Sequence, residues 1–227
     1  GTHILYRRND RHPAGRQVWL VDIEGREDRE IVDAGAEKKA FASWFPGGQR
    51  ALVLAETDTH QRVGVWHMES GNLHWVLDDP ARNVESAYVP HGSDRAVILE
   101  SKGARVQASF LDTGTGEEVT LPEIPGNLVP LAPVDGGQWL GKYYSSRQPA
   151  DLVRFSPVDP HPGSFVSLTG VWQRTPLTPA DLAAAEDFRW RAADGLEIQG
   201  WLYRTPAEPK GTIVYVHGGP TWHSQDW

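Results

Sequence analysis

The stretch TIVYVHGGP, residues 212–220, joins a run of β-branched and apolar residues to two adjacent glycines, Gly218 and Gly219. A strand that ends in glycine can bring a backbone N–H to about 3 Å from an oxygen that gains negative charge in a transition state, because no Cβ obstructs the approach. Such a donor stabilises a tetrahedral intermediate by roughly 3 to 4 kcal/mol. The residues therefore indicate an oxyanion hole for acyl transfer, and the simpler alternative is an ordinary strand-ending turn.

Arg147 and two histidines are the other residues whose types suggest a ligand. Arg147, in the stretch SSRQP, could hold a peptide carboxylate with two parallel hydrogen bonds, and the simpler alternative is a surface arginine. His67 and His74 are of a metal-binding type, but they lie on separate predicted strands without a third ligand. The sequence predicts no metal site and no cofactor.

A repeat organises most of the chain. Pro46, Pro90 and Pro133 recur at intervals of 44 and 43 residues, and each precedes a glycine-containing turn and an apolar strand. A second landmark, an alternating strand that runs into a polar turn, recurs with steps of 47, 43 and 44 residues. Short alternating strands at this period, without the 3.6-residue pattern of helices, are typical of four-stranded β-propeller blades.

About four blades fit into residues 1–177, which we expect to form an all-β propeller domain. The first blade is expected to lack its innermost strand. In the second, residues 50–77 predict three strands separated by two turns, with Trp66 and Trp75 packed between blades. Because propellers have four to eight blades, we expect these blades to belong to a larger ring.

The pattern changes after the last predicted blade. Five prolines between residues 157 and 179 indicate a linker. Thr178 is a suitable N-cap and Pro179 a suitable first helical residue, so one or two helical turns are expected there.

A β-hairpin and a buried strand are predicted next. Residues 188–192 and 196–203 alternate in polarity around Asp194-Gly195, which is a strong hairpin signal. Residues 212–216 are apolar on both faces, so we expect a central strand of a sheet. Together these elements predict a second domain in residues 178–227, the first strands of an α/β-hydrolase fold.

Composition restricts the class of protein. A hydrophobic content of 39% with ten Trp predicts a folded core, and a net charge of -8 without a basic block argues against nucleic acid as a partner. No apolar run approaches the roughly 18 residues of a membrane helix. The absence of cysteine fits a cytoplasmic protein. Because the chain begins with Gly1 rather than Met, a removed signal peptide is left open.

The order of these elements resembles the prolyl oligopeptidase family of serine peptidases. The resemblance rests on the propeller period and on three motifs: SSRQPADLVRF at 145–155, DGLEIQGWLYRTP at 194–206 and HGGP at 217–220. The histidine at the head of the last motif is closest to the acylaminoacyl-peptidase and oligopeptidase branch. The resemblance implies a propeller that caps a hydrolase domain and limits the substrates to short peptides.

The resemblance also implies roles for the HGGP residues. Gly219 would donate its backbone N–H to the oxyanion, Gly218 and Pro220 would shape the loop, and His217 would brace it. Some relatives hold a substrate amino terminus with a carboxylate pair in the propeller. Glutamates that could do so here, none of which the sequence singles out, are Glu56, Glu85 and Glu100.

One departure from the family is plain. The 227 residues contain no G-x-S-x-G motif, although in this fold the catalytic Ser, Asp and His all follow the first oxyanion loop. We therefore expect the triad to lie outside this chain, the chain alone to be inactive, and its partners to be the remainder of the hydrolase domain and a short peptide. A homo-oligomer is left open. The alternative is a non-catalytic propeller that binds other proteins.

Overall fold

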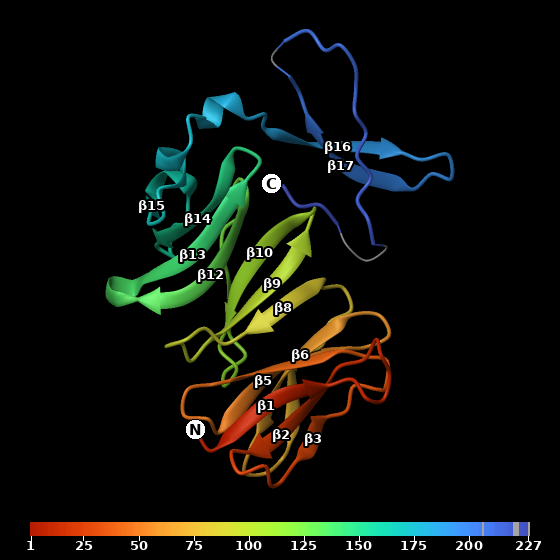
Figure 1. Cartoon of the computed structure of the whole chain (residues 1–227), viewed down its shortest axis with the longest axis vertical. Helices are drawn as coiled ribbons and strands as arrows, with labels where there is room; N and C mark the ends of the chain where they lie inside the picture. Colours follow the sequence, from red (N-terminus) through yellow and green to blue (C-terminus); the bar gives the residue numbers. More distant parts are fainter. Residues whose placement is uncertain (206, 220–222, 227) are drawn as a thin grey trace. The chain divides into compact units, whose positions relative to one another are not determined.

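The computed structural model describes residues 1–205, 207–219 and 223–226. The regular structure in these ranges is almost entirely antiparallel β-sheet (Figure 1). The chain divides into two compact units. The first consists of Gly1–Glu100 and Ala108–Leu121, and the second of Ser101–Gln107 and Pro122–Trp227.

The first unit contains three sheets, in each of which strands that follow one another in sequence are neighbours. The tip of the hairpin between β9 and β10 in the third sheet, Ser101–Gln107, belongs to the second unit. The first sheet consists of β1 (His3–Arg8), β2 (Gln17–Asp22) and β3 (Arg29–Val32). The second sheet consists of β4 (Ala40–Trp44), β5 (Arg50–Glu56), β6 (Gln61–His67) and β7 (Leu73–Leu77). The third sheet consists of β8 (Val84–Tyr88), β9 (Ala96–Lys102), β10 (Arg105–Leu111) and β11 (Glu118–Thr120).

The core of the first unit lies between its sheets. Trp66 of β6 is 1% exposed and packs with Val18 and Leu20 of β2, while Leu52 of β5 belongs to a second cluster with Ile98 of β9. The prediction that Trp66 packs between blades is confirmed, and so are the three strands within residues 50–77. Alternating side chains fill these layers because successive residues of a strand point to opposite faces.

An ionic network secures the third sheet. Arg82, in the loop before β8, donates through Nε to Glu100 Oε1 at 2.9 Å and through Nη1 to Glu118 Oε2 at 2.6 Å. Ser109 Oγ also donates to the Glu118 carboxylate. The three charged side chains are only 17% to 22% exposed. Glu100, considered above for binding an amino terminus, is therefore engaged in a contact that ties a loop to two strands.

Acid is expected to weaken this network. The hydrogen bond from Arg82 lowers the pKa of Glu118 below its ordinary value of 4.5, although burial opposes the shift. A carboxylate with a lowered folded-state pKa stabilises the fold above its unfolded pKa, and that stabilisation is lost as the pH falls through the folded pKa. We expect the melting temperature to fall below about pH 4.5, and Glu118→Gln to make the fall shallower. Glu117→Gln, at an exposed neighbour, should keep the wild-type profile; equal profiles for both variants would contradict the prediction.

The second unit contains a fourth sheet and a hairpin. The sheet consists of β12 (Asn127–Val134), β13 (Gln138–Ser145), β14 (Gln148–Phe155) and β15 (Val166–Ser167), and the hairpin of β16 (Ala185–Arg191) and β17 (Glu197–Tyr203). Short 3-10 turns are η1 (Asp135–Gly137), η2 (Pro162–Ser164), η3 (Val171–Arg174) and η4 (Pro179–Asp181). In the described part of the chain, no helix has the length and apolar character that a membrane span requires.

These elements confirm the predicted fold class in its main features. The four sheets match the expected number of blades, and the first of them has three strands. The hairpin turns at Asp194-Gly195, as predicted. The helical turn after Thr178 is a single 3-10 turn, in which Thr178 N donates to Asp181 Oδ2 at 2.7 Å.

The predicted central strand at 212–216 is wrong for this structure. The segment has no strand structure, and the side chains from Ile213 to Val216 are 80% to 96% exposed. A central strand needs hydrogen-bonded neighbours on both edges and a covering layer on each face. Among the described residues no strand pairs with this segment, so its apolar character alone does not place it in a sheet.

Candidate functional site

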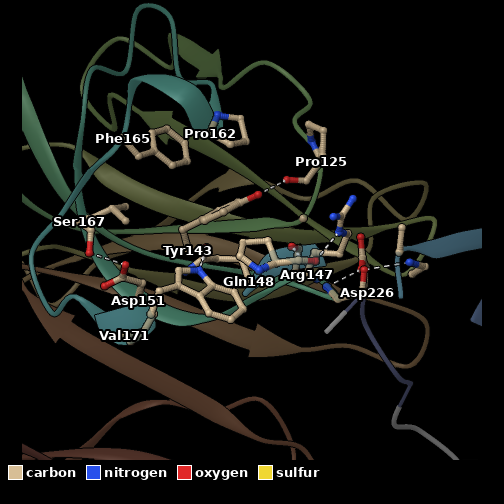
Figure 2. Close-up of a pocket in the computed structure, with 18 of the residues that line it drawn as sticks. Pro125, Tyr143, Arg147, Gln148, Asp151, Pro162, Phe165, Ser167, Val171 and Asp226 are labelled. Carbon is tan, nitrogen blue, oxygen red and sulfur yellow. Dashed lines mark hydrogen bonds between the residues drawn. The ribbon is translucent and has the colours of Figure 1, made fainter. Parts of the chain in front are cut away.

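A cavity of about 710 Å³ lies within the second unit (Figure 2). The tip of the β13–β14 hairpin forms one part of its lining, and the segment of residues 162–173 forms another. Other parts of the wall come from Arg105, Pro125, Gly126, Pro179, Ala184, Ala185 and Asp226. Residues that are far apart in sequence therefore meet at this cavity.

Aromatic rings form much of the wall. The rings of Tyr143 and Phe165 meet edge to face with centroids 5.1 Å apart, and Tyr143 Oη donates to the carbonyl oxygen of Pro125 at 2.8 Å. Trp172 Nε1 donates to Gln148 Oε1 at 2.7 Å. Burial raises the pKa of Tyr143, so its hydroxyl stays protonated at neutral pH and remains a donor. The polar atoms of Tyr143 and Trp172 are thus satisfied, and the rings contribute apolar surface to the wall.

Asp151 is one of two buried acids that line the cavity. It lies on β14 opposite Tyr143 and is 4% exposed. Its carboxylate accepts a hydrogen bond from Ser167 Oγ at 2.7 Å and another from Thr169 Oγ1. No Lys, Arg or His within the described ranges forms an ion pair with it. Sequence reasoning missed Asp151, although an acid at an inward position of an alternating strand is the signal that could have found it.

Arg147 lines the same cavity from the turn between β13 and β14 (Figure 2). Its backbone N–H donates to Ser145 Oγ at 3.2 Å, and its Nε donates to the carbonyl oxygen of Pro179 at 2.9 Å. Neither Nη group has a hydrogen bond to another described residue. The side chain is thus oriented by one end of the guanidinium, and the binding of a carboxylate at the other end stays a prediction.

A second acid is already neutralised. Asp226 is 4% exposed, and it accepts a hydrogen bond from Ser146 N at 3.0 Å and one from Arg105 Nη2 at 3.5 Å. The guanidinium of Arg105 also lies over the ring of Trp201, 4.9 Å from its centroid. This ion pair joins Arg105 to Asp226, the lining residue nearest the C-terminus.

The glycine motif lies apart from this cavity. Gly219 has φ of +69°, in the left-handed region that favours glycine. His217 is exposed, with Nδ1 lying 3.3 Å from the carbonyl oxygen of Gly218. None of these residues lines the cavity, and Pro220 lies outside the described residues. The structure therefore brings Arg147 together with Asp151 but does not bring it together with the HGG motif.

The chain shares its fold with propeller-containing hydrolases and peptidases. A Mycobacterium tuberculosis puromycin-hydrolyzing peptidase matches with a TM-score of 0.63 at 16% identity, over 93% of this chain and 34% of that chain. Pyrococcus horikoshii acylaminoacyl peptidase matches with a TM-score of 0.60 at 16% identity, over 91% and 31%. Prolyl oligopeptidase B from Galerina marginata matches with a TM-score of 0.64 at 11% identity, over 88% and 29%.

These likenesses establish the fold, and the chain spans about a third of the length of each solved structure. No protein-family model and no curated protein matches the sequence.

Proposed function

We propose that this chain is part of a serine peptidase of the prolyl oligopeptidase family that hydrolyses short peptides in the cytoplasm. Residues 1–177 would supply propeller blades that restrict access to large substrates, and residues 178–227 would begin the α/β-hydrolase domain. The catalytic Ser, Asp and His would come from a segment that this sequence does not contain, so the chain alone would be inactive.

The shared fold carries this proposal. The solved structures named above are peptidases by their titles, and each covers at least 88% of the chain. A covered share of 88% or more would extend past residue 177, where we propose that the propeller part ends. A propeller that only binds proteins would not need the β16–β17 hairpin and the glycine motif that follow.

Gly219 would contribute to the chemistry through its backbone. When a serine oxygen attacks the scissile carbonyl carbon, the carbonyl oxygen becomes an oxyanion, and an N–H aimed at that oxygen stabilises it. The positive φ of Gly219 is compatible with such a turn. Gly218 would keep the loop free of a Cβ, and His217 would brace it through its contact with the Gly218 carbonyl.

The proposal can be tested on the full-length protein. We expect a fluorophosphonate to label one serine and unblocked peptides of a few residues to be hydrolysed, with folded proteins left intact. As a control, the labelled protein should no longer hydrolyse peptides, because the labelled serine is proposed to be the nucleophile. Absence of both labelling and hydrolysis would refute the peptidase and favour the protein-binding propeller.

A further inference from the structure

Two charges in the cavity have no counter-charge. Four charged side chains line it, namely Arg105, Arg147, Asp151 and Asp226. Arg105 and Asp226 pair with each other at 3.5 Å. In the described part of the chain, Asp151 and Arg147 form no ion pair, so the cavity presents one unpaired carboxylate and one unpaired guanidinium.

The unpaired carboxylate of Asp151 is the group whose burial is unfavourable in free energy. A buried anion is stable when it is hydrogen-bonded and paired, and Asp151 has only the first of these. A carboxylate offers about four lone pairs, and hydroxyl groups occupy one on each oxygen here. The remaining lone pairs can accept hydrogen bonds from an ammonium group.

The unpaired guanidinium suits the opposite charge. Arg147 is exposed, and Pro179 accepts a hydrogen bond from its Nε, which leaves the two Nη groups without a partner among the described residues. A guanidinium with free Nη groups matches the two oxygens of a carboxylate. Figure 2 shows Asp151 beside Ser167 on one side of the cavity and Arg147 on the other.

The spacing of the two groups suggests the size of the ligand. Asp151 lies on β14 and Arg147 in the turn before it, four residues away, so their Cα atoms are at most about 14 Å apart. An extended peptide spans about 3.3 to 3.6 Å per residue, so about three or four residues bridge this distance. Tyr143, Phe165 and Trp172 line the space that the intervening side chains would occupy.

We propose that this cavity binds a short peptide with both termini free, its ammonium group at Asp151 and its carboxylate at Arg147. The inference rests on the proposed function and goes beyond it, because it adds a binding cavity apart from the glycine motif that selects unblocked peptides of about three or four residues. Binding of both ends would exclude long chains and peptides with a blocked terminus from this cavity.

The test separates binding from hydrolysis. The binding experiment uses the full-length protein in which alanine replaces the serine that fluorophosphonate labels. If no serine is labelled, the wild-type protein is used. Calorimetry then measures the affinity for Ala-Phe-Ala and for its N-acetylated, C-amidated and doubly blocked forms. We expect each blocking group to weaken binding at least about tenfold, the effect of losing one charged hydrogen bond.

Variants assign each penalty to a residue. Asp151→Asn should remove the penalty of acetylation alone, and Arg147→Gln the penalty of amidation alone. Matched controls are Asp159→Asn and Arg154→Gln, which change the same charges at positions that do not line the cavity and should preserve both penalties.

Two outcomes would overturn the proposal: equal affinities for all four peptides, or penalties that persist in the two variants. If Asp151→Asn does not fold, the proposal is still tested by the affinities of the parent protein for the four peptides and by the affinities of Arg147→Gln. A failure to bind while peptides are hydrolysed would reject this inference and leave the peptidase proposal standing.

Discussion

Replacement of Gly219 by alanine is expected to lower kcat/KM of the full-length protein for short peptides at least about a hundredfold, with a much smaller change in KM. Loss of one oxyanion-hole donor costs about 10² to 10³ in kcat. Alanine retains the N–H, but its Cβ disfavours the φ of +69° and would obstruct the approach of the carbonyl oxygen. Steady-state kinetics with an unblocked peptide measure the effect.

The matched control is Gly195→Ala in the β16–β17 turn. Gly195 has φ of +86°, and a Cβ there would meet no atom within 4 Å. Both substitutions therefore introduce similar backbone strain of about 1 to 2 kcal/mol, but only one is proposed to face the reacting oxygen. Equal losses of activity in the two variants would attribute the effect to folding and contradict a role of Gly219 in the oxyanion hole.

The blades could be predicted from the sequence because their signals are local. An alternating strand followed by a glycine turn identifies each hairpin within about ten residues, and Pro46, Pro90 and Pro133 repeat this signal at nearly constant intervals. Trp66 was placed correctly for the same reason, since its position on an alternating strand fixes the face to which it points.

The strand at 212–216 shows the limit of such reasoning. Its β-branched residues have the intrinsic preference of a strand, but strand structure depends on partners that are distant in sequence. With no partner among the described residues, the side chains of Ile213 and Val214 lie exposed. The local sequence predicted the type of element that the segment favours, but it carries no information on which strands would pair with it.

The cavity was only half predicted, again for a reason of distance along the chain. Arg147 could be singled out because it lies in the stretch SSRQP of the last predicted blade, near the predicted domain junction. Asp151 depends on Ser167 and Thr169, which approach it only because β15 pairs with β14. The ion pair between Arg105 and Asp226 joins residues 121 positions apart, so no local pattern could have predicted it.

Replacement of Arg82 by leucine is expected to lower the free energy of unfolding by about 3 kcal/mol. The change leaves Glu100 and Glu118 as two largely buried carboxylates without their shared cation, and removing one partner of such a network costs about 3 to 5 kcal/mol when it is fully buried. Because each side chain is about a fifth exposed, we expect the lower end of this range. Urea unfolding with an unchanged m-value measures the loss.

Arg189→Leu is the matched control, because Arg189 also contacts two acids, Asp187 and Glu197, but is 49% exposed. It should cost less than about 1 kcal/mol, as exposed ion pairs do. If unpaired charge is the cause, adding Glu100→Gln and Glu118→Gln to Arg82→Leu should recover part of the lost stability, because neutral amides need no counter-ion. A triple variant less stable than Arg82→Leu would instead attribute the loss to the missing hydrogen bonds and packing of the guanidinium.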